Sequence, residues 1–302
     1  MTQSGGGVAP LSDTEFRLLR DLIHRESGIQ LPDGKMSLLV GRLGKRVRAL
    51  GLPSFGTYYR YVVDHPETDE VVQLLDCIST NETHFFREPK QFAFLDEVVF
   101  PSWYAEARIG RRPKRVRVWS AACSTGDEAY SLAMVLLDHF PPADGWHVEV
   151  LATDISTRAL ARAQAGVWSV EQAKHIPDRY LKRFMHRGTR SQQGKMRAGA
   201  EVRAVTTFRR LNLQAASYAV VGLCDLVVCR NALMYFSVER RGAVVSRLLL
   251  HLAPRGYLLV GHAESLARVT NEVRAVHPTI YQRPDTGISR RPEAARGSRR
   301  VG

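Results

Sequence analysis

The spacing of apolar positions changes near residue 80. Before that point apolar residues recur every three or four positions, and Gly or Pro separate the periodic segments. The sequence Ser12-Asp-Thr-Glu15 has the form of a capping box, and a second segment carries an apolar stripe at Leu39, Leu43 and Val47. Residues 1–80 are therefore predicted to form a small all-α domain.

After residue 115 short β-branched runs alternate with helical patterns. Residues 116–130 pass from a β-branched run through small residues into a helix, which predicts strand, tight turn and helix. Further strands are expected at 148–152, 224–231 and 257–260, and helices at 89–107, 128–140, 157–165 and 238–252. This order is typical of an α/β fold with a parallel, Rossmann-like sheet.

Between residues 167 and 210 the pattern loosens. A short helix is expected at 180–184, and residues 194–208 show β-branched alternation with Gly at the turns. We expect a small antiparallel β-subdomain inserted at about 180–210, within a domain that covers 81–284. Residues 285–302 contain five Arg and two acidic residues without apolar periodicity, which predicts a disordered basic tail.

The net charge of +13 adds the expectation of an acidic partner. Residues 35–60 hold six basic residues and no acidic one. Three of them, Arg42, Lys45 and Arg46, fall off the apolar stripe of their helix, although an ordinary solvated helix surface explains them equally well.

The four cysteines lack C-x-x-C spacing, so free thiols are expected and a metal site is not. No apolar run is long enough to span a membrane, and the first residues do not resemble a signal peptide. A cytoplasmic location is therefore expected.

Several polar residues fall where parallel strands end. Asp154 closes the second strand, where a carboxylate can accept both hydroxyls of a ribose, although it also suits the N-cap of the next helix. Asn212, Arg230, Asn231 and Tyr235 fall at the same edge of the predicted sheet. Ligands of open α/β sheets bind at such an edge, so we expect the site there.

The segment before the sheet also carries polar groups. Asn81, Thr83 and Arg87 offer hydrogen-bonding groups beside two aromatic residues, although a capped helix start with an aromatic anchor is the simpler explanation. No Ser-His-Asp order, H-E-x-x-H or G-K-[ST] sequence occurs. This argues against hydrolases of those types and against a P-loop ATPase, and leaves group transfer from a nucleoside cofactor.

Six ordered motifs resemble those of CheR-type chemotaxis receptor methyltransferases. They are Thr80-Asn-Glu-Thr-His-Phe-Phe-Arg-Glu88, Trp119-Ser-Ala-Ala-Cys-Ser-Thr-Gly-Asp-Glu128, Ala152-Thr-Asp-Ile155, Leu211-Asn-Leu213, Val228-Cys-Arg-Asn-Ala-Leu-Met-Tyr-Phe236 and Gly261-His-Ala-Glu264. The resemblance covers about residues 12–283. It implies a helical N-terminal domain and an S-adenosylmethionine-dependent methyltransferase domain with an inserted β-subdomain.

The resemblance also implies roles for individual residues. The family's contacts with S-adenosylmethionine, or with the product S-adenosylhomocysteine, fall on Asn81, Thr83, Arg87, Glu128, Asp154, Asn212, Leu213, Arg230 and Asn231. Asp154 would hold the ribose, and Asn212 and Leu213 would flank the adenine. Arg87 would orient the substrate carboxylate as a catalytic residue, with Tyr235 beside it; their simpler roles are loop anchor and core aromatic. The sequence departs from the family at Asp127-Glu-Ala129, where Glu-Glu-Pro is usual.

The activity implied is methylation of glutamate side chains on the cytoplasmic helices of chemoreceptors. Arg42, Lys45 and Arg46 would dock the acidic receptor helix, the β-subdomain would bind a receptor's C-terminal tail, and a monomer is expected. Two alternatives stay open: a methyltransferase acting on another protein or on nucleic acid, which the charge suits, and an S-adenosylmethionine-binding sensor without transfer. The Asn/Asp-Pro-Pro-Tyr motif of base-methylating enzymes is absent, so no nucleic-acid partner is expected.

Overall fold

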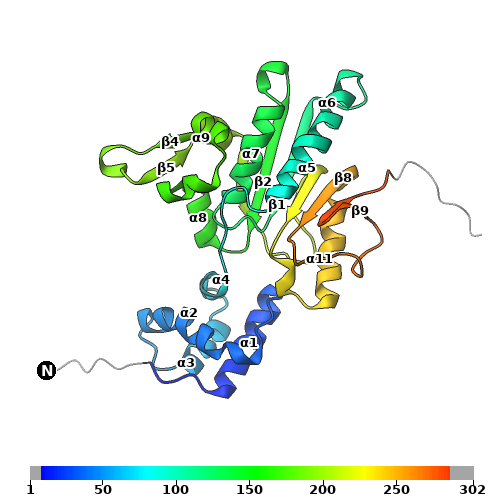
Figure 1. The fold of residues 1–302 in the computed structure, drawn as a ribbon. Coiled ribbons are helices and arrows are strands. Elements are labelled where there is room, and N and C mark those ends of the chain that lie inside the picture. Colours follow the sequence, from blue (N-terminus) through cyan, green and yellow to red (C-terminus); the bar gives the residue numbers. More distant parts are fainter. Residues whose placement is uncertain (1–7, 286–302) are drawn as a thin grey trace, which may run out of the picture.

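The computed structural model describes residues 8–285 and divides into a helical N-terminal part and an α/β part (Figure 1). The N-terminal helices are α1 (Asp13–Ser27), α2 (Met36–Ala49), α3 (Phe55–Asp64) and α4 (Glu70–Ile78). The predicted capping box is present, because Glu15 N donates to Ser12 Oγ and Ser12 N donates to the Glu15 carboxylate. The predicted stripe on α2 is fully buried in the core of these helices.

The α/β part is built on a seven-stranded sheet in the order β6-β2-β1-β7-β8-β10-β9. Its strands are β1 (Arg115–Ala121), β2 (His147–Asp154), β6 (Thr206–Arg210), β7 (Cys224–Cys229), β8 (Leu252–Val260), β9 (Arg274–His277) and β10 (Ile280–Gln282). The first five strands of that order pair in parallel, and β10 pairs antiparallel with both of its neighbours, β8 and β9. The predicted fold class is confirmed.

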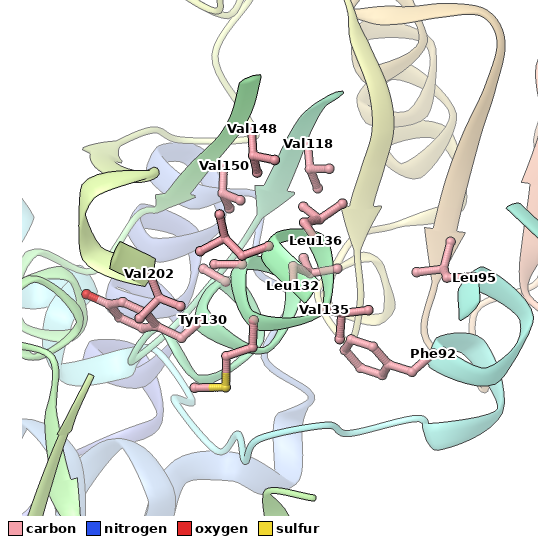
Figure 2. Close-up of a cluster of buried hydrophobic side chains, with 14 of the residues drawn as sticks. Phe92, Leu95, Val118, Tyr130, Leu132, Val135, Leu136, Val148, Val150 and Val202 are labelled. Atoms are coloured by element: carbon pink, nitrogen blue, oxygen red, sulfur yellow. The ribbon is translucent and has the colours of Figure 1, made fainter. Parts of the chain in front are cut away.

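Helices cover both faces of this sheet. One face packs against α5 (Pro89–Phe94), α6 (Phe100–Arg108), α7 (Asp127–His139) and α8 (Thr157–Ala165), and the other packs against α11 (Val238–Leu250). A π-helical segment, Leu95–Val99, joins α5 and α6, so the helix expected at 89–107 is interrupted. Figure 2 shows side chains of α7, including Tyr130 and Leu132, packed beneath Val118, Val148 and Val150 of the central strands.

The small antiparallel sheet is present, but its strands differ from the expectation. It consists of β3 (Val167–Ser169), β5 (Lys195–Ala198) and β4 (Met185–Arg187), accompanied by α9 (Asp178–Phe184) and α10 (Ala200–Ala204). The expectation that residues 206–208 belong to this insertion is wrong, because Thr206–Arg210 pairs in parallel with β2 in the large sheet. The alternation of residues 194–208 therefore spans two different sheets.

The two parts of the chain meet through hydrogen bonds beside the carboxyl edge of the large sheet. Asp76, buried on α4, accepts from Thr157 Oγ1 at 2.5 Å, at the start of α8. Asn212 Nδ2 donates to Glu26 O at the end of α1 at 2.7 Å, and Gln30 N donates to Tyr235 O at 2.9 Å. The end of α1 and the segment after it are thereby fixed against the sheet edge.

Among the described residues, no helix combines the length and the apolar character needed to cross a membrane. The basic tail expected at 285–302 lies, except for Asp285, outside the described residues.

Candidate functional site

A cavity of about 560 Å³ opens at the carboxyl edge of the large sheet, a size typical of small-molecule sites. Its wall includes every residue expected to contact the cofactor or the substrate carboxylate: Asn81, Thr83, Arg87, Glu128, Asp154, Asn212, Leu213, Arg230, Asn231 and Tyr235. The structure thus brings together residues as far apart in the chain as Asn81 and Tyr235. The segment after α1 closes the cavity from the side of the helical domain.

The turn between β1 and α7 is shaped by backbone conformations that suit small residues. Ala122, Ser124 and Gly126 have φ angles of 80°, 50° and 90°, and a Cβ on Gly126 would lie 2.8 Å from Ala163 Cβ. Asp154 holds this turn, because its carboxylate accepts from Ser124 N at 2.8 Å and from Ser156 N at 2.9 Å. The N-cap role considered for Asp154 belongs to Ser156, whose side chain accepts from Ala159 N; Asp154 instead holds the backbone before α8 and lines the cavity.

Burial raises the pKa of the Asp154 carboxyl, against the opposing effect of the backbone N–H groups that donate to it. The side chain is almost fully buried. Each carboxylate oxygen accepts a backbone hydrogen bond and is shielded from water. Ligand hydroxyl groups that donate to this carboxylate would therefore help to stabilise its buried charge.

The segment that carries Arg87 is held in an unusual backbone conformation. Phe86 and Glu88 have φ angles of 52° and 62°, although neither is Gly. Phe86 N donates to Ser131 Oγ on α7 at 3.0 Å, and Arg87 Nη1 donates to Glu82 O at 3.2 Å. Such outliers persist only where the surroundings enforce them, which favours a functional role for this loop.

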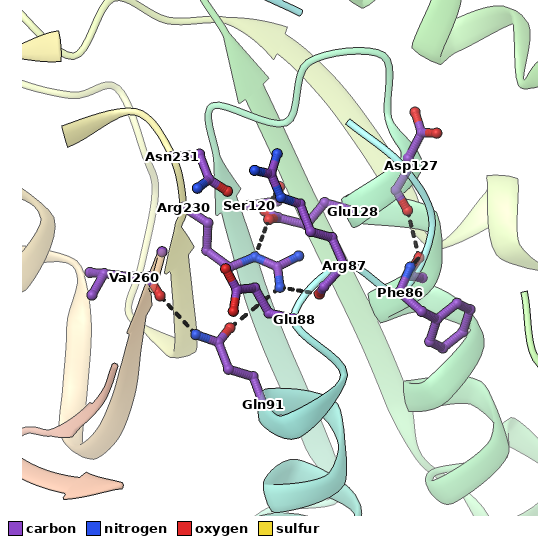
Figure 3. Close-up of polar contacts among 12 residues, drawn as sticks. Phe86, Arg87, Glu88, Gln91, Ser120, Asp127, Glu128, Arg230, Asn231 and Val260 are labelled. Carbon is purple, nitrogen blue, oxygen red and sulfur yellow. Dashed lines mark hydrogen bonds and ion pairs between the residues drawn. The ribbon is translucent and has the colours of Figure 1, made fainter. Parts of the chain in front are cut away.

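Arg230 and Glu128 form a buried ion pair in the cavity wall (Figure 3). Arg230 Nε donates to Glu128 Oε2 at 2.7 Å, Arg230 Nη1 donates to Arg87 O at 2.5 Å, and Glu128 Oε1 accepts from Ser120 Oγ at 2.6 Å. The guanidinium is committed to protein groups, so Arg230 fixes the backbone of Arg87 more directly than it offers charge to a ligand.

The three basic residues expected to dock a receptor lie in different environments. Lys45 is exposed. Arg46 pairs with Glu70, a buried carboxylate that also accepts from Tyr58 OH at 2.8 Å. The expectation that Arg46 offers its charge to a receptor is therefore corrected, because that charge is already paired. Arg42 lines the cavity and donates to Ile78 O and Thr80 Oγ1, which places it at the site rather than on an open surface. The reason is that α4 packs directly against α2.

Several residues of the site were given no individual role from the sequence. Ser124 Oγ is buried and has no hydrogen-bond partner among the described residues, and Gln91 Nε2 donates to Val260 O at 2.7 Å. Glu264 is fully buried behind the cavity wall. A polar residue in an apolar stretch is the only sequence signal for Gln91, whereas Glu264 stands in the last of the six motifs.

Comparison with known proteins agrees with this arrangement. The model of the CheR methyltransferase SAM binding domain matches residues 81–282, and the model of the CheR methyltransferase all-alpha domain matches residues 14–79. The chain is 36% identical over 272 residues to the chemotaxis protein methyltransferase of Escherichia coli strain K12, which covers 90% of this chain and 91% of that protein. It is 33% identical over 267 residues to chemotaxis protein methyltransferase 2 of Pseudomonas aeruginosa, which covers 88% and 92%. It is 35% identical over 285 residues to the chemotaxis protein methyltransferase of Klebsiella aerogenes, which covers 92% and 94%.

The two family models together cover almost all of the described residues, and they divide the chain where the helical part meets the α/β part. The resemblance of the six motifs is thereby confirmed. The chain belongs to the CheR methyltransferase family and is an S-adenosylmethionine-dependent methyltransferase.

Proposed function

We propose that this chain methylates glutamate side chains on the cytoplasmic helices of chemotaxis receptors, with S-adenosylmethionine bound in the cavity at the sheet edge. The observation that carries the proposal is the convergence of the polar residues of separate motifs on one cavity wall, next to Asp154 at the end of β2. Family membership favours this activity over the nucleic-acid and sensor alternatives.

The groups in the cavity fit the cofactor. Asp154 supplies carboxylate oxygens for ribose hydroxyls, and Ser124 Oγ is a buried polar atom for which the described residues supply no partner. Asn212 and Leu213 lie together on the wall, where an amide and an apolar side chain suit an adenine ring. We assign Asn81, Thr83 and Asn231 to the remaining polar contacts.

When bound, S-adenosylmethionine supplies a methyl group activated by a sulfonium. A glutamate carboxylate is already a nucleophile, so the chain need not supply a general base. Its task is to align the carboxylate, exclude water and balance charge. We assign alignment to the Arg87 guanidinium, which remains charged and matches a carboxylate geometrically, and a supporting hydrogen bond to Tyr235.

We test this assignment with Arg87→Ala and Arg87→Lys. Both variants should lower methyl transfer to receptor at least about tenfold, because each loses the bidentate geometry, which is worth more than 1.4 kcal/mol for a charged hydrogen bond. Thermal unfolding should change little, because within residues 8–285 the Arg87 side chain makes only one long hydrogen bond. Wild-type methylation rates in both variants would reduce Arg87 to a loop anchor.

We place receptor contacts on two surfaces. The first is the exposed side of α2 around Lys45, with Arg42 at the cavity mouth, which suits an acidic helix. The second is the small sheet, where Arg190, Lys195 and Arg197 are exposed and a receptor's C-terminal tail is proposed to bind. We propose that the chain acts as a monomer.

A further inference from the structure

Glu264 is a fully buried carboxylate that follows β8 and has no assigned role. It accepts three backbone hydrogen bonds: Oε2 from Asn231 N at 2.8 Å and from Gly261 N at 2.8 Å, and Oε1 from Met234 N at 3.0 Å. Burying a carboxylate costs free energy unless such donors compensate for lost water. This arrangement therefore persists because both oxygens are satisfied by the backbone.

The three donors belong to chain segments that the sheet no longer holds. The parallel pairing of β7 and β8 ends at Cys229 and Val260. Beyond it, Asn231 adopts a left-handed backbone conformation with a φ of 58°, and residues 231–235 run along the cavity wall. The Glu264 carboxylate accepts hydrogen bonds from backbone N–H groups that, among residues 8–285, have no strand partner beyond this point.

We propose that Glu264 is a positioning residue of the methyl-transfer site, whose carboxylate fixes the backbone of residues 231–235 so that Asn231 and Tyr235 face the cavity. This inference rests on the proposed function, because it takes Asn231 as a cofactor contact. Glu264 itself does not line the cavity and acts through the backbone that it holds. A mutation at Glu264 should therefore alter cofactor affinity without removing any cavity group.

Gly261 offers an independent way to disturb the same contact. A Cβ at Gly261 would lie 2.8 Å from Asn231 Nδ2, 2.9 Å from Asn231 N and 2.9 Å from Glu264 Oε2. Its φ lies outside the left-handed region, so alanine meets a steric conflict with this contact rather than a backbone penalty. Gly261→Ala thus keeps the carboxylate group but crowds its contact with Asn231 N from both sides.

The experiment measures S-adenosylhomocysteine affinity by calorimetry in the full-length chain. Glu264→Gln replaces one acceptor oxygen by an NH₂ group that faces a backbone N–H. Affinity should fall about tenfold in Glu264→Gln and in Gly261→Ala, the loss expected when a hydrogen bond to a charged group is removed. If Glu264→Gln does not fold, Gly261→Ala still provides the measurement.

Glu70→Gln is the matched control. Glu70 is another buried carboxylate with side-chain donors, but it lies within the helical domain and does not line the cavity. This variant should lower the thermal unfolding temperature and leave S-adenosylhomocysteine affinity within twofold of wild type. A parallel loss of affinity there would mean that general destabilisation explains Glu264→Gln, and would overturn the proposal.

A double-mutant cycle gives the sharpest result. In a chain that already carries Asn231→Ala, Glu264→Gln should have little left to disturb. The double variant should therefore bind S-adenosylhomocysteine less than threefold more weakly than Asn231→Ala alone. Full additivity, or unchanged affinity in a destabilised Glu264→Gln variant, would show a purely structural role. Because the readout is binding, a chain that binds S-adenosylhomocysteine but fails to methylate receptor would contradict the proposed function while the cycle still decides the role of Glu264.

Discussion

At the scale of single residues, Asp154 serves both the protein and the proposed cofactor. Its carboxylate accepts a hydrogen bond from Ser124 N and thereby holds the turn after β1. Asp154 is also the last residue of β2, the strand next to β1. A ribose that binds there meets an acceptor already fixed in position, so little conformational entropy is lost on binding. Substitution of Asp154 is therefore the most direct perturbation of cofactor affinity.

We expect Asp154→Ala to weaken S-adenosylhomocysteine binding by about 2 kcal/mol, roughly 30-fold, because two hydrogen bonds to a charged acceptor are lost. In the proposed site the cofactor hydroxyls bind the ionised carboxylate, so wild-type affinity should fall as pH decreases and the carboxyl takes up a proton. Because burial raises this pKa, the fall should begin at a higher pH than for an exposed aspartate, whose pKa is about 3.9.

Asp154→Asn provides the control for the pH series, because it keeps the shape of the side chain without a titrating group. Calorimetry across the acidic range should show the affinity of wild type falling toward that of Asp154→Asn. Parallel pH profiles for the two proteins would assign the titration to the ligand or to another residue.

At the scale of secondary-structure elements, the end of α1 is fitted closely into the α/β part. Gly28 ends α1 with a φ of 75°, and a Cβ there would lie 2.6 Å from the Phe236 ring and 2.7 Å from Gln214 Oε1. The chain then continues into the segment that closes the cavity. Alanine at this position would push apart two elements that share the site.

Gly28→Ala should lower the free energy of unfolding by about 1 kcal/mol for the left-handed backbone and by a further 1–3 kcal/mol for overpacking. Gly51→Ala isolates the first term, because Gly51 also has a positive φ but an added Cβ meets no atom within 4 Å. Denaturant unfolding measures both variants. Equal losses would show that Gly28 is needed only for its backbone conformation.

Elements with a strong local pattern were predictable from the sequence. The helix over Thr157–Ala165 and the end of β2 at Asp154 follow from periodicity and strand chemistry, and they fix the edge where the site lies. Thr206–Arg210 was misassigned because its alternation fits any half-exposed strand, and only its pairing with β2 decides the sheet. Arg46 and Glu70 are 24 positions apart in the chain and lie on different helices. Helical periodicity describes neighbours within one helix, so it does not predict their pairing.

At the scale of the whole molecule, receptor docking should depend on the exposed charge of α2. Lys45→Glu should raise the KM for receptor and spare S-adenosylhomocysteine affinity, and the effect should weaken with salt because exposed charges are screened. Arg46→Glu is unsuited to this test, since it would leave the buried Glu70 carboxylate beside a second negative charge.

Arg108→Glu is the matched charge reversal for Lys45→Glu. Arg108 is exposed at the end of α6, and Figure 1 shows α6 on the opposite side of the molecule from α2. Its receptor KM should equal that of wild type. Equal increases in both variants would show a response to net charge alone, and an increase caused only by deletion of the receptor tail would move docking to the small sheet.

The proposed function requires that the cavity at the sheet edge supports methyl transfer to receptor glutamates. The most direct measurement is transfer of tritiated methyl from S-adenosylmethionine to receptor membranes by the purified wild-type chain, followed by treatment with base. We expect label on the receptor that base releases as methanol, as for a carboxyl methyl ester, and no such label when the substrate glutamates are replaced by alanine. Label that resists base, or that appears on nucleic acid instead, would contradict the proposed function.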